Sequence, residues 1–185
     1  AATKPFGFMK FTPGPGLGGH CIPVDPHYLS WKMRTLNYKT RFIELASEVN
    51  SEMPYFIVDR VRDALKQQTK SVCGAEVFLF GVAYKRDVCD VRESPAMDVL
   101  KLLVEEGANV SYHDPFVPEL EQEGFDLKSV EPTSELLAST DVAVILTAHS
   151  SIDYEWVVSQ VRALVDARRV VPRDFGTGAS WIVKG

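Results

Sequence analysis

The run EVFLFGV at residues 76–82 and the segment SPAMDVLKLLVEEG at residues 94–107 decide the fold class. The first is a short, continuously apolar run, as expected for a strand that is buried on both faces of a parallel sheet. In the second, Ser94 is placed to cap a helix, Pro95 is acceptable at its first position, and Gly107 can end it. A strand followed by such a helix is the repeating unit of α/β folds.

The same alternation continues toward the C-terminus. The pattern predicts strands at residues 109–113, 141–147 and 164–167 and a helix at residues 154–161. We therefore predict a Rossmann-like, doubly wound α/β domain with a parallel sheet. Ligands of such sheets bind at the carboxyl ends of the strands, which places Tyr84, Lys85 and Arg92 at a natural site after the first strand.

A long amphipathic helix is predicted ahead of this domain, from Arg41 to Lys66. Its apolar residues recur at steps of three and four, opposite a face rich in Glu and Asp. Pro54 is expected to kink this helix or to divide it in two. About 26 residues of helix span roughly 39 Å, more than a chain of this size needs internally. We therefore predict that part of the apolar stripe forms the seam of a dimer.

The length of 185 residues allows a domain with an appendage. The polar segment at residues 67–74 is predicted to be a linker. We accordingly predict two units, residues 1–70 with the long helix and residues 71–185 with the sheet.

The stretch TPGPGLGGHCIPVDP at residues 12–26 contains four glycines and four prolines, which predicts a loop rather than a helix or a central strand. Cys21 follows Gly18 and Gly19, where the missing Cβ atoms let a flat ligand approach the backbone. With Asp25 four residues later, we predict a loop for covalent catalysis, with Cys21 as nucleophile and Asp25 as its polar partner. A small buried cysteine is the structural alternative.

This loop also contains the spacing G-x-G-x-x-G at Gly14, Gly16 and Gly19, which is the fingerprint of a dinucleotide site when a strand precedes it and a helix opens inside it. Pro23 and Pro26 stand where that helix would have to grow, and the preceding run FGFMKF at residues 6–11 is too short and glycine-interrupted for the strand, so we reject the match. A short helix is predicted only afterwards, from about residue 27 to residue 37.

Two long motifs together resemble one known family. The run GPGLGGHCIPVDP at residues 14–26 and the run FGVAYKRDVCDVRESPA at residues 80–96 are similar to the nucleotide-sugar 6-dehydrogenases, the UDP-glucose and GDP-mannose dehydrogenase family. The chain looks most like the branch that acts on UDP-N-acetylhexosamines. UDP-glucose enzymes usually carry a serine where His20 stands and a lysine where Val24 stands.

The resemblance implies an activity and a set of site residues. Family members oxidise the C6 alcohol of the sugar to a carboxylate and pass two hydrides to NAD. Cys21 would form a thiohemiacetal and then a thioester, and Asp25 would orient or activate the water that cleaves it. Contacts to the UDP-sugar are implied for Phe11, Gly14, Gly16, Gly18, Tyr84 and Lys85, and contacts to NAD for Arg92 and Cys21. Asp166 and Arg168 match an Asp-x-Arg near the last strand of the family.

The resemblance also implies partners. It implies a homodimer through the long helix, with Lys4 as a candidate for reaching the neighbouring subunit. The main NAD-binding domain of the family, and its catalytic lysine and asparagine, would lie upstream of this chain. We therefore predict that the chain is the UDP-sugar-binding and dimer-forming C-terminal portion of such an enzyme and is not a competent dehydrogenase alone. A free-standing nucleotide-sugar-binding or interaction module is the alternative, and a cysteine hydrolase built on Cys21, Asp25 and His20 is a weaker one.

Composition excludes several other classes. Hydrophobic residues make up 45% and charged residues 24% of the chain, as in ordinary globular proteins. A net charge of -5 argues against a nucleic-acid surface, and no apolar run is long enough for a membrane span. The three cysteines have no metal-binding spacing, and no signal peptide is recognisable, which favours a reducing cytoplasm.

Overall fold

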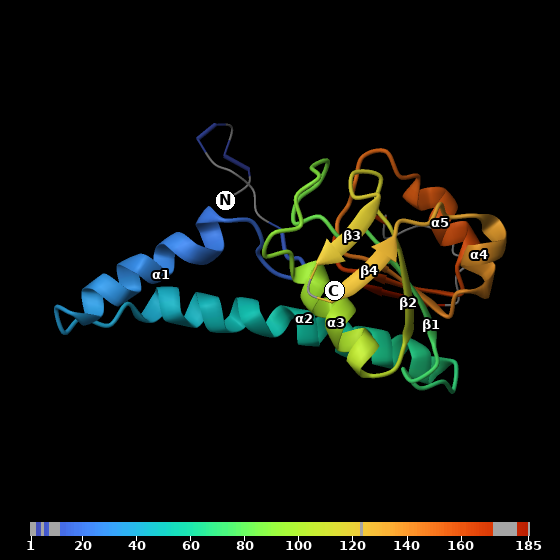
Figure 1. Ribbon diagram of the computed structural model, residues 1–185, viewed down its shortest axis with the longest axis horizontal. Coiled ribbons are helices and arrows are strands. Elements are labelled where there is room, and N and C mark those ends of the chain that lie inside the picture. Colours follow the sequence, from blue (N-terminus) through green and yellow to red (C-terminus); the bar gives the residue numbers. More distant parts are fainter. Residues whose placement is uncertain (1–2, 5, 8–11, 123, 172–180, 185) are drawn as a thin grey trace.

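The computed structural model describes residues 3–4, 6–7, 12–122, 124–171 and 181–184. Two helices come first, α1 (Cys21–Arg34) and α2 (Arg41–Gln67). Helix α1 and the first turns of α2 lie side by side as an arm that projects away from a sheet domain, as Figure 1 shows. All further elements belong to that sheet domain.

The sheet domain alternates strands and helices. Its elements are β1 (Glu76–Phe80), α3 (Pro95–Glu105), β2 (Asn109–His113), β3 (Glu119–Gln122), β4 (Phe125–Lys128), α4 (Ser134–Ser139), β5 (Val142–Ile145), α5 (Tyr154–Gln160), β6 (Ala163–Asp166) and β7 (Trp181–Lys184). Five strands form one parallel sheet in the order β2-β1-β5-β6-β7, and β3 and β4 form a separate antiparallel pair. The predicted α/β fold with a parallel sheet is therefore confirmed.

Strand β1 shows how the sheet is covered on both faces. Val77 and Leu79 belong to a core cluster that includes residues of α2 and α3. Phe78 and Phe80 point to the opposite face and pack with residues of α4 and α5. Because neighbouring strand residues alternate between faces, a continuously apolar strand requires helices on both sides. Burying each of these side chains contributes roughly 1.5–3 kcal/mol.

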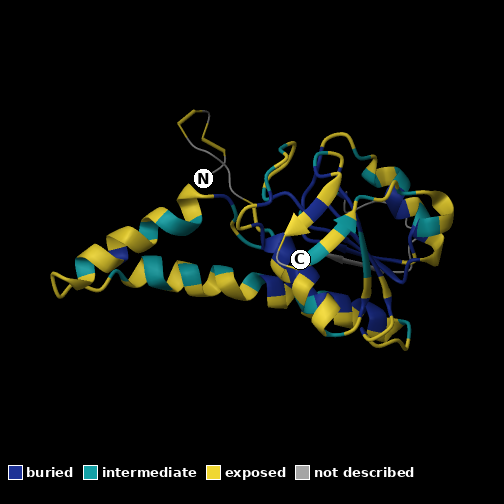
Figure 2. Ribbon diagram, in the orientation of Figure 1, coloured by how far each residue is buried: buried dark blue, intermediate teal, exposed yellow. Residues whose placement is uncertain are grey.

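Helix α2 joins the arm to this core. Its buried residues begin at Pro54 and continue through Leu65, whereas the preceding turns carry none, as the colours of Figure 2 show. Of the two effects predicted for Pro54, a kink or a division of the helix, the division does not occur, because α2 runs unbroken over 27 residues. An interior proline costs roughly 3 kcal/mol, and the burial of the following turns against the sheet is large enough to offset that cost.

The prediction that residues 12–26 form only a loop was also wrong. Helix α1 begins at Cys21, not near residue 27, and it contains both Pro23 and Pro26. Pro23 lies in the first turn, where backbone N–H groups have no partner within the helix, so its missing donor costs little. Only Pro26 interrupts the internal hydrogen bonds of the helix.

Other boundaries agree closely with prediction. Helix α3 is capped by Ser94, whose Oγ accepts from the N–H of Ala96. Strand β1 ends two residues earlier than predicted because Gly81 takes a left-handed φ of 80°. The β3–β4 pair, helix α4 and strand β7 were not predicted. Among the described residues, no helix has both the length and the apolarity to cross a membrane.

Candidate functional site

The strand order has a topological switch point between β1 and β5. After β1 the chain moves outward to β2 and then returns to the other side of β1 to form β5. The chain leaves β1 and β5 toward helices on opposite faces of the sheet, α3 and α5, and doubly wound folds bind ligands at the carboxyl end of the sheet at such a point. Thr147 Oγ1 joins the loops that follow β1 and β5 by donating to the carbonyl oxygen of Ala83 at 2.6 Å.

Gly81 is required by this geometry. A Cβ at Gly81 would lie 2.6 Å from the Cβ of Thr147 and would also overlap the carbonyl oxygen of Thr147. The left-handed φ of Gly81 independently disfavours any other residue. The close approach of the loops after β1 and β5 therefore depends on a glycine at this position.

Residues 84–93, called here the site loop, contain three cations. The side chains of Lys85 and Arg86 are exposed, and Tyr84 is half-buried. Arg92 donates through Nε and Nη2 to the carboxylate of Asp90, and this hydrogen bonding lowers the pKa of Asp90 to about 2. The guanidinium fork of Arg92 is therefore occupied by a carboxylate within its own loop.

The glycine stretch, residues 14–19, packs directly on the site loop. Gly19 donates its N–H to the carbonyl oxygen of Arg92 at 3.1 Å. A Cβ at Gly18 would lie 2.6 Å from the carbonyl oxygen of Glu93, and a Cβ at Gly19 would lie 2.8 Å from the ring of Tyr84. The fold thus brings the two sequence motifs together, although more than 60 residues separate Gly19 from Tyr84.

The glycines serve this packing and do not form a pyrophosphate cradle. A helix does begin at Cys21, so the first of our two reasons for rejecting the dinucleotide fingerprint was wrong, and the second concerns residues 6–11, most of which lie outside the described residues. The rejection itself is supported by other contacts, because Gly16 lies against Pro95 and Gly19 against Tyr84. The turn after β1 does not fit a pyrophosphate either, since α3 opens on a proline that has no N–H to donate. In the described part of the chain, neither the glycine stretch nor the turn after β1 therefore fits a pyrophosphate.

Arg168 is a residue of the site that sequence reasoning left without a role. It follows β6 by two residues, and its guanidinium lies so close to Gly14 that a Cβ there would overlap it. Burial lowers the pKa of Arg168, although the charge of Asp166 acts in the opposite direction. A half-buried cation beneath the glycine stretch is a suitable partner for a phosphate group.

Cys21 and Asp25 are both exposed on α1. They are the first and fifth residues of the helix, so they lie on the same face one turn apart. Of the other predicted contacts, Gly14, Gly16 and Gly18 lie in the packed glycine stretch, and Phe11 is outside the described residues. No group of three His, Cys, Asp or Glu side chains suited to a metal ion occurs in the described part of the chain.

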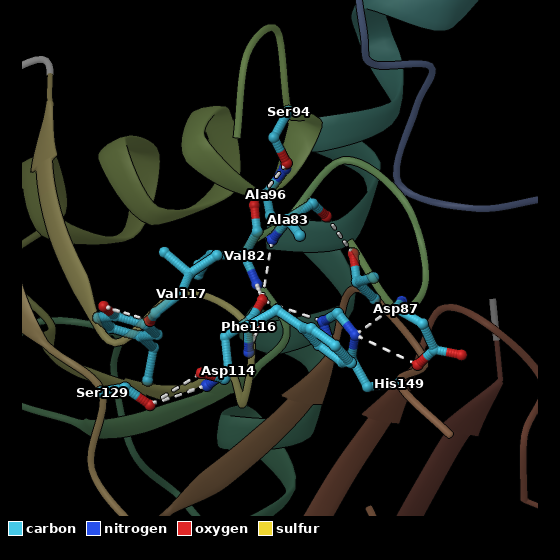
Figure 3. A network of polar contacts seen from close by, with 12 residues as sticks. Val82, Ala83, Asp87, Ser94, Ala96, Asp114, Phe116, Val117, Ser129 and His149 are labelled. Carbon is cyan, nitrogen blue, oxygen red and sulfur yellow. Dashed lines mark hydrogen bonds and ion pairs between the residues drawn. The ribbon is translucent and has the colours of Figure 1, made fainter. Parts of the chain in front are cut away.

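A buried acid and a buried histidine lie beneath the site loop, as Figure 3 shows. Asp114 follows β2, and its carboxylate accepts the N–H groups of Val82 and Ala83 at 2.8 and 3.0 Å. His149 Nε2 lies 3.0 Å from the same carboxylate oxygen. Burial raises the pKa of Asp114, but these hydrogen bonds outweigh it and leave the pKa below its ordinary value.

Comparison with known proteins agrees with this geometry. The model of the UDP-glucose/GDP-mannose dehydrogenase family, UDP binding domain, matches residues 78–173, which is more than half of the chain. The model of the central domain of the same family matches residues 1–52. The chain belongs to the UDP-glucose/GDP-mannose dehydrogenase family.

Individual members of this family are similar over part of their length. A UDP-N-acetyl-D-mannosamine dehydrogenase of Methanococcus maripaludis is 36% identical over 137 residues, which cover 74% of this chain and 29% of the relative. The enzyme of the same name from Escherichia coli K12 is 35% identical over 144 residues, covering 75% of this chain and 33% of the relative. The chain thus spans about a third of the length of the curated relatives it matches.

Solved structures of the family share the fold. A UDP-D-ManNAc dehydrogenase from Pyrococcus horikoshii superimposes with a TM-score of 0.79 at 25% identity, covering all of this chain and 42% of the other. A UDP-N-acetyl-mannosamine dehydrogenase from Staphylococcus aureus gives a TM-score of 0.70 at 28% identity, covering all of this chain and 41% of the other. Both the arm and the sheet domain therefore have counterparts in known members of the family.

Proposed function

We propose that this chain is the UDP-sugar-binding and dimer-forming part of an NAD-dependent UDP-N-acetylhexosamine 6-dehydrogenase. The observation that carries the proposal is the packing of the glycine stretch onto the site loop, which joins the segment before Cys21 to Tyr84 and Lys85. The similarity to UDP-N-acetyl-D-mannosamine dehydrogenases supports the choice of substrate class.

The cations on the site loop and beneath the glycine stretch would bind the diphosphate. Lys85 is exposed on the site loop as a point charge, and Arg168 offers a half-buried fork beneath the glycine stretch. Tyr84 would contact the sugar or base, together with Phe11 and the glycine backbone. Arg92 is assigned to NAD, and to reach it the guanidinium would exchange its carboxylate partner Asp90 for a ligand phosphate.

The chemistry would depend on Cys21 and Asp25. The thiolate of Cys21 would add to the C6 aldehyde carbon, and the carbonyl oxygen would take a proton to give a thiohemiacetal. After oxidation to the thioester, water activated near Asp25 would attack the carbonyl carbon and release the acid and the free thiol. The exposure of both side chains on one face of α1 supports this assignment. The oxidation steps require NAD, whose main binding domain we propose lies outside these 185 residues, so we expect the chain alone to be inactive.

The arm would form the dimer. Phe42, Leu45 and Val49 recur on one face of α2, and all three are exposed, with Phe42 at 88%. Trp31 on α1 is 67% exposed as well. An apolar surface of this kind is typical of a protein–protein interface, and a second copy of the same arm would bury it. A reducing cytoplasm would suit the three exposed free cysteines.

Calorimetric titration tests the proposal. UDP, UDP-N-acetylglucosamine, UDP-N-acetylmannosamine and NAD are each titrated into the purified chain, and its mass in solution is measured alongside. We expect the UDP compounds to bind to a dimer and NAD not to bind. Lys85→Ala should weaken UDP binding by about ten- to a hundredfold, since a charge-assisted hydrogen bond contributes about 1.5–3 kcal/mol.

A matched substitution controls for nonspecific effects of charge. Lys128 is an exposed lysine on β4 that pairs with Glu119, so Lys128→Ala should leave UDP binding unchanged. Absence of binding by any UDP compound to the folded chain would refute the binding function. Steady NAD reduction by the chain alone would refute its predicted inactivity.

A further inference from the structure

The site loop is held in an unusual backbone conformation. Asp87 and Glu93 both have positive φ values, 59° and 49°, although neither is a glycine. Residues with side chains remain in this region only where their surroundings determine the conformation. The contacts that hold Asp87 therefore decide the shape of the loop that presents Tyr84 and Lys85.

His149 provides the contact to the backbone N–H of Asp87. Its Nδ1 accepts the backbone N–H of Asp87 at 3.0 Å. The carboxylate of Asp87 in turn accepts the N–H and the hydroxyl of Ser150 at 2.8 and 2.7 Å. The loop after β5 thus binds both the backbone and the side chain of the same residue of the site loop (Figure 3).

The tautomer of His149 follows from its two partners. Because Nδ1 accepts a backbone N–H, the ring hydrogen of the neutral form lies on Nε2, which faces the carboxylate of Asp114 at 3.0 Å. His149 is fully buried, and the ring of Phe116 packs against it with centroids 5.0 Å apart. Asp114 is itself fixed by backbone donors at the ends of β1 and β2. The carboxylate therefore orients the imidazole, and the imidazole orients the loop.

We propose that His149 is a positioning residue of the nucleotide-sugar site, which holds the site loop through the Asp87 N–H in the tautomer that Asp114 selects. This inference rests on the proposed function for the ligand that the loop binds, but the positioning itself is a property of the unliganded chain. Sequence reasoning gave His149 no role, because its partners lie 35 and 62 residues away.

Two substitutions separate positioning from simple filling of the core. Asparagine places its amide oxygen as many bonds from Cα as Nδ1, so His149→Asn retains an acceptor for Asp87 but loses the donor to Asp114. Glutamine places its amide nitrogen as many bonds from Cα as Nε2, so His149→Gln retains the donor to Asp114 but loses the acceptor for Asp87. Both replace a ring by an amide inside the same buried pocket.

The proposal predicts that amide exchange and UDP affinity rank the two variants in one order and that global stability ranks them in the opposite order. Amide exchange of the peptide covering Asp87, measured without ligand, should be fastest in His149→Gln and intermediate in His149→Asn. Affinity for UDP should be weakest in His149→Gln and intermediate in His149→Asn. His149→Gln should bind about two- to tenfold more weakly than the unchanged chain, which is the range expected for one lost hydrogen bond. Global stability should rank the other way, because His149→Asn removes the side-chain donor to a buried carboxylate.

A second buried histidine supplies the control. His113 ends β2, and among the described residues no hydrogen bond joins its ring to the site loop. His113→Gln should therefore leave both the exchange of Asp87 and the affinity for UDP unchanged.

Several results would overturn the proposal. If His149→Gln protects the Asp87 amide at least as well as His149→Asn, the histidine only fills space and pairs Asp114. If both variants unfold, the nitrogen-15 chemical shifts of the His149 ring in the unchanged chain carry the test, because a neutral ring with its hydrogen on Nδ1 could not accept the Asp87 N–H and would refute the positioning. If the unchanged chain binds no UDP compound, the proposed function fails, while the exchange measurement still decides on His149.

Discussion

Substitution of Gly19 by alanine tests the contact between the two motifs of the site. Gly19 has a φ of 87°, and a Cβ there would lie 2.8 Å from Cε2 of Tyr84. The left-handed conformation costs a residue with a Cβ about 1–2 kcal/mol. Ordinary contacts to a Cβ begin near 3.4 Å, so the ring must also shift, and overpacking of this kind typically costs about 1–3 kcal/mol. We expect Gly19→Ala to destabilise the chain by about 2–5 kcal/mol.

Gly74 offers a control in which only the backbone cost applies. Its φ is 77°, and no atom lies within 4 Å of a Cβ placed there. Gly74→Ala should therefore cost about 1–2 kcal/mol, and the difference between the two variants isolates the contact with Tyr84. Urea unfolding of both variants, followed by circular dichroism, measures this difference from the midpoints and slopes.

A double-mutant cycle makes the test specific. Tyr84→Ala removes the ring that the new methyl group would strike, so Gly19→Ala should cost about 1–3 kcal/mol less in that background. UDP affinity should also fall in Gly19→Ala and stay unchanged in Gly74→Ala, because only the first displaces Tyr84. Equal costs for the two glycines, with no relief from Tyr84→Ala, would show that the glycine stretch does not rest on the site loop.

Three further predictions concern the rest of the chain. Phe42→Glu places a charge on the exposed stripe of α2 and should convert a dimer to a monomer in light scattering; an unchanged mass would remove Phe42 from the interface. Ser94→Ala removes the cap of α3 and should lower the free energy of unfolding by about 1–2 kcal/mol, a loss that an unchanged urea midpoint would contradict. Burial raises the pKa of Asp141, but hydrogen bonds from Lys70 and the N–H of Glu76 outweigh it and leave the pKa below its ordinary value. The resulting stability is present above about pH 4 and is lost as the pH falls through the folded-state pKa, so Asp141→Asn should flatten the acid limb of a stability–pH curve.

Much of the sheet domain could be predicted because its signals are local. Strand β1 is a continuous apolar run, and α3 lies between a serine cap and a glycine stop, so both were found with boundaries correct to within two residues. The β3–β4 pair lacks such signals. Its strands have four residues each, and Leu120 is the only fully buried side chain among the described residues of the pair. Short strands that bury so little are set by the surrounding fold rather than by their own pattern.

The residues of the site likewise fall into those that the sequence pattern predicted and those whose place depends on the folded chain. Tyr84 and Lys85 were expected at the carboxyl end of the first strand from the predicted topology alone, and in the structure they follow β1 there. The start of α1 was missed because proline propensity was applied without regard to the first turn, where Pro23 is harmless. His149 and Arg168 were left without a role because their partners are defined only by the folded chain. A hydrogen bond to a residue 62 positions away leaves no trace in local spacing.

The glycine stretch shows why its motif cannot be explained by local conformation. Gly14 faces Arg168, Gly16 faces Pro95, and Gly18 and Gly19 face the site loop, so the four glycines contact three different parts of the sheet domain. Only Gly16 and Gly19 have φ values that disfavour other residues, whereas Gly14 and Gly18 are required by contact alone. If the four glycines had served flexibility, their surroundings would be open, as they are at Gly74. The segment that carries the proposed nucleophile therefore takes its shape from residues beyond position 70, and the site is built from both sides of the predicted boundary between the two units.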